Sequence, residues 1–133
     1  MAHNDAFELA PVAPEFFVPD VDAAVAFYTD VLGYTLLRKE GSPATFAIGH
    51  INGATIMFMH QRWYAGPAGE LDRRGTGVDI RIMVPDVDAF YERVRAAECK
   101  ILHEIGDRDY GLRDFIMRDP NGFRLRFASP LAP

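Results

Sequence analysis

A six-residue string occurs twice in this chain and restricts the folds that it can adopt. Val18–Ala23 reads Val-Pro-Asp-Val-Asp-Ala, and Val84–Ala89 repeats it letter for letter, 66 positions later. A second match, between Ile51–Gly53 and Pro120–Gly122, follows at an offset of 69. The offset is half of the 133 residues, and there are only two copies. Such a period indicates a duplicated module rather than a solenoid of short repeats.

Each copy predicts a strand followed by a helix. The extended segments Glu15–Val18 and Asp79–Val84 both end before a proline, a position that disfavours helix. The aspartate after each proline, Asp20 or Asp86, is a typical helix N-cap, and apolar residues then recur at helical spacing. Gly33 provides a stop for the first helix. The second copy has glutamate at the matching position, which is unfavourable if positive φ is required there.

Three strand-like stretches follow each helix, separated by turn residues. They are Tyr34–Lys39, Thr45–Ile48, Ala54–Met59, Lys100–Glu104, Phe115–Arg118 and Phe123–Phe127. The order predicts an α+β fold of two tandem βαβββ modules. We place module 1 at about 13–60, a Gly- and Pro-containing connector at 61–77 and module 2 at about 78–128. At this length the modules are expected to form one domain, 1–133.

Composition narrows the class of partner. Acids outnumber bases by 19 to 14, and the arginines are scattered rather than gathered in a stripe, which argues against nucleic acid as a partner. No apolar run approaches the about 18 residues of a membrane span. The first ten residues lack the apolar core of a signal peptide. The single cysteine, Cys99, cannot form an internal disulfide, which is consistent with the reducing cytoplasm.

The doubled βαβββ order resembles the vicinal oxygen chelate superfamily, which includes glyoxalase I, extradiol dioxygenases and bleomycin-resistance proteins. Local strings are similar to the bleomycin-resistance-like branch, and the likeness extends from Pro14 to Pro130. The strings are Pro14–Val18, Phe27–Tyr34, Tyr110–Phe115 and Arg118–Phe127. The resemblance implies a curled, cup-like mixed sheet. It also implies a homodimer, because paired subunits build the ligand grooves in that branch.

The resemblance further implies four positions at which metal-using members place two histidines and two carboxylates. They lie seven residues before the repeated aspartate and four residues after the turn glycine. Here those positions hold Ala13, Asp79, Met57 and Arg126. A divalent cation needs several deprotonated N, O or S ligands, and only Asp79 qualifies. We therefore expect no metal and no other cofactor.

Other catalytic chemistry finds little support. Ser42 lies in a turn and Ser129 near the C-terminus, and neither sits in a nucleophile elbow. Cys99 has no neighbouring histidine in the sequence. A new metal site at His60 and His103 stays open as a minor alternative. We assign no catalytic residue.

Strand alternation predicts a lined hollow. Leu125 and Phe127 share one face of the last strand, so Arg124 and Arg126 share the other. The positions expected to face inward are Glu15, Phe17, Thr55, Met57, Met59, Asp79, Arg81, Met83, Arg124 and Arg126. Methionine and phenylalanine form an adaptable apolar wall, and a few charges would orient a ligand. The alternative is that these side chains only fill a small core.

Three aromatic residues outside the repeated elements, Trp63, Tyr64 and Tyr110, either stack on a planar ligand or anchor a subunit interface. The predicted ligand-binding set is Phe17, Met57, Met59, Trp63, Tyr64, Asp79, Arg81, Tyr110 and Arg126. We also expect Asp79 and Arg126 to pair where relatives hold the metal.

Two function classes follow. The first is a metal-free protein that sequesters a small planar or amphipathic molecule such as an antibiotic. The acidic balance suits a cationic drug, whereas the arginines Arg81, Arg124 and Arg126 suit an anionic ligand. The second is a metal-dependent lyase, isomerase or dioxygenase of the same superfamily. A purely structural role is the third possibility.

Overall fold

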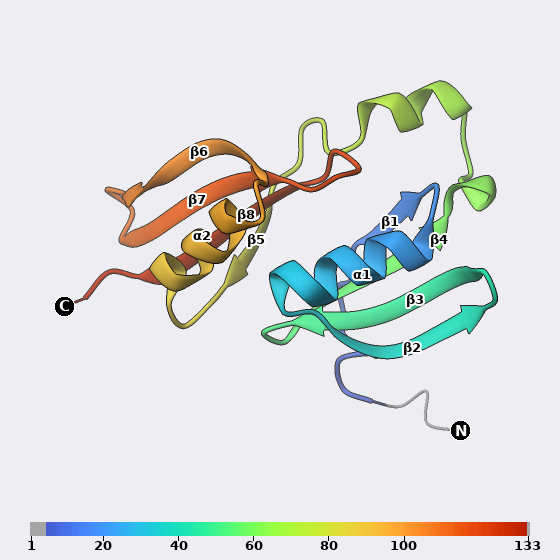
Figure 1. The fold of residues 1–133 in the computed structure, drawn as a ribbon, viewed down its shortest axis with the longest axis horizontal. Coiled ribbons are helices and arrows are strands. Elements are labelled where there is room, and N and C mark those ends of the chain that lie inside the picture. The colour runs from blue at the N-terminus through green and yellow to red at the C-terminus, as the bar shows by residue number, and fades with distance from the viewer. Residues whose placement is uncertain (1–4, 133) are drawn as a thin grey trace. The chain divides into compact units, whose positions relative to one another are not determined.

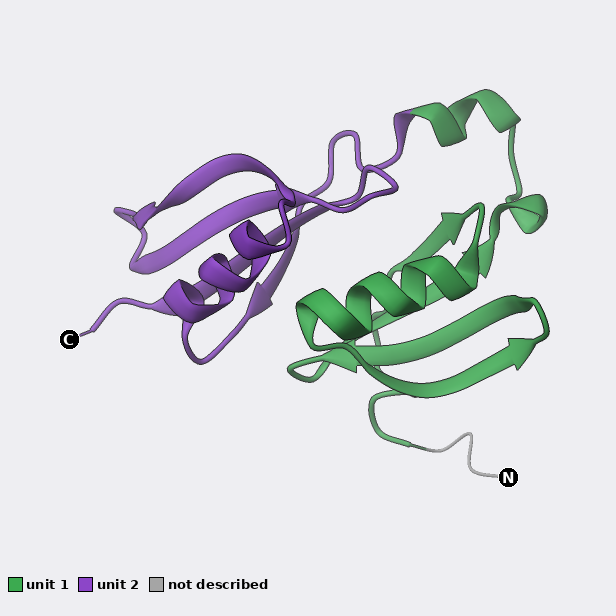
Figure 2. Cartoon of the chain, viewed as in Figure 1, with its two compact units in different colours: residues 1–72 green, residues 73–133 purple. Residues whose placement is uncertain are grey.

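The computed structural model describes residues 5–132. The chain forms two compact units, and the boundary lies between Asp72 and Arg73 (Figure 2). Among the described residues each unit has one α-helix and one four-stranded mixed sheet, so the predicted α+β fold of tandem βαβββ modules is confirmed.

Unit 1 contains the first copy of the repeat. Its elements are β1 (Glu15–Val18), α1 (Val21–Leu32), β2 (Thr35–Gly41), β3 (Ala44–Ile51), β4 (Ala54–His60), the 3-10 helix η1 (Gln61–Trp63) and most of a second one, η2 (Ala68–Arg73). The sheet has the order β1-β4-β3-β2 (Figure 1). β1 runs parallel to β4, and the other pairs are antiparallel.

Unit 2 repeats this topology. Its elements are β5 (Ile80–Met83), α2 (Val87–Ala96), β6 (Lys100–Asp107), β7 (Leu112–Arg118) and β8 (Arg124–Pro130). The order is β5-β8-β7-β6, with β5 parallel to β8. Several strands are longer than the sequence predicts. β7, for example, begins at Leu112 rather than Phe115, because backbone pairing with β8 continues past the apolar residues.

The helix boundaries follow the predicted signals. The side chain of Asp20 accepts a hydrogen bond from the Ala23 amide at 2.9 Å, and Asp86 caps the second helix in the same way. Gly33 ends the first helix with a φ of 73°. Glu98, two residues after the second helix ends, has a φ of 58°, so this glutamate does adopt the left-handed conformation that glycine tolerates better.

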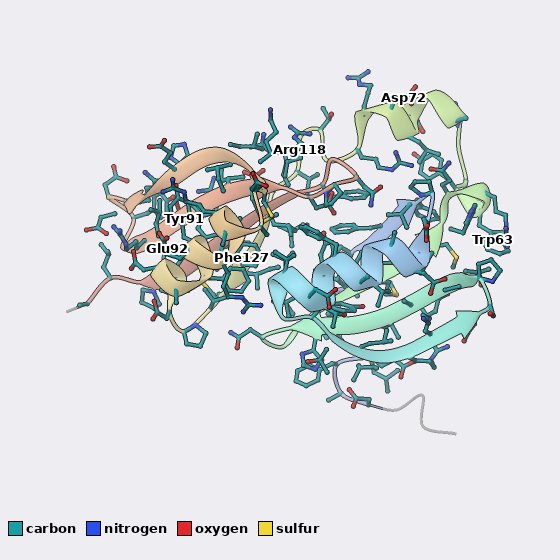
Figure 3. All side chains as sticks on the ribbon, in the orientation of Figure 1. Trp63, Asp72, Tyr91, Glu92, Arg118 and Phe127 are labelled. Carbon is teal, nitrogen blue, oxygen red and sulfur yellow. The ribbon has the colours of Figure 1, made fainter. Side chains whose placement is uncertain are left out.

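The core of each unit lies between the helix and one face of the sheet. In unit 1 the buried ring of Phe58 packs against Tyr28 and Tyr34, with centroids 4.8 and 5.5 Å away. In unit 2 Phe127 packs against Phe90 at 4.3 Å, and Tyr91 lies on the same side of the sheet (Figure 3). The opposite face of each sheet is called here the helix-free face. It carries the side chains that alternate with the buried ones: Phe17, Met57 and Met59 in unit 1, and Arg81, Arg124 and Arg126 in unit 2.

Candidate functional site

The helix-free face of unit 2 gathers arginines from two parallel strands. β5 and β8 pair so that Arg81 lies directly opposite Arg126. On the other side of β8, Arg124 is paired with Arg118 of β7 and Arg126 with Ile116. Leu125 and Phe127, which alternate with these arginines, are fully buried on the helix side. The predicted alternation in β8 is therefore correct.

Asp79, just before β5, joins two of these arginines. Its Oδ1 accepts from Nε of Arg124 at 2.5 Å, and its Oδ2 accepts from Nη2 of Arg126 at 3.4 Å. The hydrogen bond from Arg124 is the main reason that the pKa of Asp79 lies below its usual value. The expected contact between Asp79 and Arg126 exists. Asp79 makes a shorter contact with Arg124, and Arg126 makes a shorter contact with Asp114. Both side chains are also about a quarter exposed, so they are not the isolated buried pair that the sequence suggested.

Asp114 of β7 is the centre of this network, and sequence reasoning missed it. Its side chain is 0 % exposed. Oδ1 accepts from Nε of Arg108 at 2.8 Å, and Oδ2 accepts from Nη1 of Arg126 at 2.9 Å and from the hydroxyl of Tyr110 at 2.5 Å. Burial by itself would raise the pKa of Asp114, but these three hydrogen bonds outweigh it and hold the pKa below the usual value.

Tyr110 and Arg81 complete the predicted set in unit 2. The Tyr110 hydroxyl also accepts from Nη1 of Arg126 at 3.0 Å, while the residue is 56 % exposed. Its bond to Asp114 is the main reason that the pKa of Tyr110 is raised. Arg81 is exposed, and within residues 5–132 it has no ion pair. The structure therefore brings Asp79, Tyr110 and Arg126 together and places Arg81 beside Arg126.

The helix-free face of unit 1 is mainly apolar. In the pairing of β1 with β4, Phe17 lies opposite Met59 and Glu15 opposite Met57. The ring of Phe17 also meets Tyr64 edge-on, with centroids 5.3 Å apart. Phe17 and Tyr64, two of the predicted residues, are thus in contact.

A hollow of about 510 Å³ lies on unit 1, next to Met59. Its lining residues are Arg38, Glu40, Thr45, Phe46, Met59 and Trp63. Trp63 lies on η1 (Figure 3), and its side chain is half exposed. Sequence reasoning found Met59 and Trp63 but missed Phe46, which is Met59's neighbour in β3, and Arg38, whose guanidinium lies 5.2 Å from the Phe46 ring.

The segment before β1 covers part of the same face. The ring of Phe7 packs on His50 with centroids 4.1 Å apart, and the Phe7 carbonyl accepts a hydrogen bond from Thr55. Glu8 pairs with Arg38 at 2.6 Å. Thr55, expected to face a hollow, is instead buried beneath this segment.

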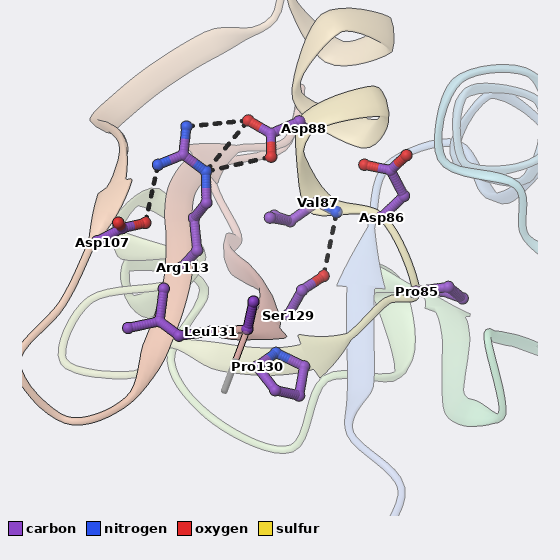
Figure 4. A pocket seen from close by; sticks show the side chains of 10 residues that line it. Pro85, Asp86, Val87, Asp88, Asp107, Arg113, Ser129, Pro130 and Leu131 are labelled. Carbon is purple, nitrogen blue, oxygen red and sulfur yellow. Dashed lines mark hydrogen bonds and ion pairs between the residues drawn. The ribbon is translucent and has the colours of Figure 1, made fainter.

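A second hollow, of about 470 Å³, lies in unit 2 beside the start of α2 (Figure 4). Arg113 spans it with ion pairs to Asp88 and Asp107, both at 2.9 Å. Ser129 accepts from the Val87 amide and donates to the Val84 carbonyl, which is a structural role. None of the predicted ligand-binding residues lines it.

The side chains at the four expected metal positions do not fit a divalent cation. Ala13 has no ligating atom and Met57 offers only a thioether, while Arg126 brings a positive charge. Both oxygens of Asp79 already accept from guanidinium groups. Across residues 5–132, no three His, Cys, Asp or Glu side chains come together as a metal site would need.

A family model and a relative of similar sequence indicate the family of this chain. The model of the Glyoxalase/Bleomycin resistance protein/Dioxygenase superfamily matches residues 9–127. A lactoylglutathione lyase of Haemophilus influenzae is 31% identical over 116 residues, which cover 83% of this chain and 84% of that protein.

Solved structures agree on the fold. TioX from Micromonospora sp. ML1 superimposes with a TM-score of 0.74 at 23% identity, covering 93% of this chain and 98% of that one. The fosfomycin resistance protein FosX from Listeria monocytogenes gives a TM-score of 0.68 at 17% identity, with coverage of 90% of this chain and 92% of that one.

Within residues 5–132, no helix has the length and apolar character needed to cross a membrane.

Proposed function

Because the chain belongs to the Glyoxalase/Bleomycin resistance protein/Dioxygenase superfamily, we propose that it is a member that binds a small molecule without using a metal. One observation carries the proposal. Two of the positions at which metal-using members of the superfamily place ligands lie in unit 2. One holds Arg126, and the other holds Asp79, whose two oxygens accept hydrogen bonds from Arg124 and Arg126. A guanidinium in such a place favours an anion and repels a cation.

The proposed ligand contacts are the predicted residues of each unit. In unit 1 these are Phe17, Met57, Met59, Trp63 and Tyr64, and in unit 2 they are Asp79, Arg81, Tyr110 and Arg126. Methionine and aromatic side chains suit a planar or amphipathic molecule. An antibiotic is one candidate, since FosX, which shares the fold, is a fosfomycin resistance protein.

The setting of this function is also proposed. The exposed Trp63 and Tyr110 support a homodimer in which these aromatic residues lie near the interface. The free thiol of Cys99 is consistent with the cytoplasm. Neither a nucleic acid nor a membrane is a partner in this proposal.

The alternative is a metal-dependent lyase, isomerase or dioxygenase. The identity to the Haemophilus influenzae lactoylglutathione lyase favours this alternative. It requires a cation to displace Arg124 and Arg126 from Asp79, or to find ligands outside that site.

A metal titration separates the two. A protein that binds a cation in its native state gains thermal stability by mass action. We expect no increase in melting temperature with Zn²⁺, Ni²⁺, Mn²⁺ or Fe²⁺, and no lactoylglutathione lyase activity with any of them. A saturable increase that disappears in Asp79→Asn, accompanied by activity, would establish the enzyme instead.

A further inference from the structure

Two arginines lie side by side on the helix-free face of unit 2 without a carboxylate to share. Arg81 and Arg126 are direct partners in the parallel pairing of β5 with β8. Like charges placed opposite each other across strands destabilise a sheet. Arg126 has Asp79 and Asp114 as counter-charges, but Arg81 has no ion pair in residues 5–132.

The neighbouring carboxylates are already committed. Both oxygens of the fully buried Asp114 are used, by Arg108 on one side and by Tyr110 and Arg126 on the other. Both oxygens of Asp79 accept from Arg124 and Arg126. Asp79 and Asp114 are thus shared among Arg108, Arg124 and Arg126, while Arg81 reaches neither, so positive charge is in excess on this part of the face.

Arg126 is also held in place. Nη1 donates to Asp114 and Tyr110, and Nη2 lies 3.4 Å from Asp79, so contacts on both sides restrict the guanidinium. A side chain that is ordered beforehand loses less conformational entropy when a ligand binds. Asp114 is therefore a positioning residue for Arg126.

We propose that Arg81 and Arg126 form a binding site for a doubly charged oxyanion group of the phosphate class, carried by the small-molecule ligand. This rests on the proposed binding function and names the chemical class of the ligand. Guanidinium groups donate paired hydrogen bonds to such oxygens. A group with two negative charges compensates more of this excess positive charge than a single carboxylate does.

The test is calorimetric titration of the whole chain with inorganic phosphate, after treatment with EDTA and at constant ionic strength. Acetate is the singly charged comparison. The variant is Arg81→Gln, which removes an exposed side chain without an ion pair, so the fold has little to lose. The matched control is Arg73→Gln, which removes the same charge from an exposed arginine of η2.

We expect phosphate to bind more tightly than acetate and Arg81→Gln to weaken phosphate binding about tenfold, as for the loss of one charge-assisted hydrogen-bonding group. Arg73→Gln should bind as the unchanged chain does. Equal binding of phosphate and acetate, or equal effects of the two variants, would overturn the inference. Neither of these results would contradict the proposed metal-free function, because that function is tested separately, by the metal content of protein purified without chelator.

Discussion

Replacing Asp114 with asparagine tests the network of unit 2 most sharply. The change keeps the shape of the side chain but removes the charge that faces Arg108 and Arg126. One oxygen becomes an NH₂ group, so at least one of the three hydrogen bonds to Asp114 is lost. Hydrogen bonds to charged groups contribute about 1.5–3 kcal/mol each.

The expected loss is smaller than the sum over three bonds. Arg108 and Arg126 keep 21% and 26% of their side-chain exposure, so water compensates them in part. Arg108 also keeps its bonds to the carbonyls of Glu104 and residue 114. We expect Asp114→Asn to lower the free energy of unfolding by about 2–4 kcal/mol at neutral pH.

The assay is urea unfolding followed by circular dichroism, with Asp107→Asn as the control. Asp107 pairs with Arg113, but its side chain is 65% exposed, so its loss should lower stability by at most about 1 kcal/mol. The lowered pKa of Asp114 adds a pH test. Its contribution is present above the ordinary aspartate pKa and is lost as the pH falls through the lower folded value. Equal losses of stability in the two variants, or a difference that persists in strong acid, would show that the charge of Asp114 is not what stabilises this network.

Three further predictions concern the core of unit 1, the contacts of Arg126 and the assembly of the chain. Burial raises the pKa of Tyr34, whose hydroxyl donates to the Ile56 carbonyl. The free energy of unfolding should therefore fall as the pH rises above about 10, and it should fall less steeply in Tyr34→Phe. Equal slopes for the two proteins in urea unfolding at alkaline pH would contradict this. In double-mutant cycles the coupling energy of Arg126 with Asp114 should exceed that with Asp79, because the contact with Asp114 is shorter and its carboxylate is buried. A larger coupling energy with Asp79 would contradict this prediction. The proposed homodimer predicts a mass of two chains by light scattering at tens of micromolar protein, and a single-chain mass would rule it out.

Much of the fold can be predicted from local signals. The repeated string places Asp20 and Asp86 at the starts of both helices, and Gly33 has the positive φ of a helix stop. Strand lengths are predicted less well. β7 continues back through Asp114 to Leu112, and no local rule predicts that a charged residue will lie fully buried within a strand.

The site is only partly predictable. The alternation of apolar and polar residues in β8 predicts that Arg124 and Arg126 lie on the same face of the sheet. The positions at which metal-using relatives place ligands identify Asp79 as a candidate. Alternation does not give the register between strands. The register and the β6–β7 turn bring Arg108, Tyr110 and Asp114 to Arg126. An aspartate next to an apolar run is the one signal that could have indicated this network.

Metal analysis of the chain, purified without added metal and without chelator, tests the central claim most directly. We propose that Arg126 and the engaged carboxylate of Asp79 stand where metal-using members of the superfamily hold a cation. We therefore predict zinc, iron, manganese and nickel contents far below one ion per chain. A content near one ion per chain of any of these metals would contradict this proposal.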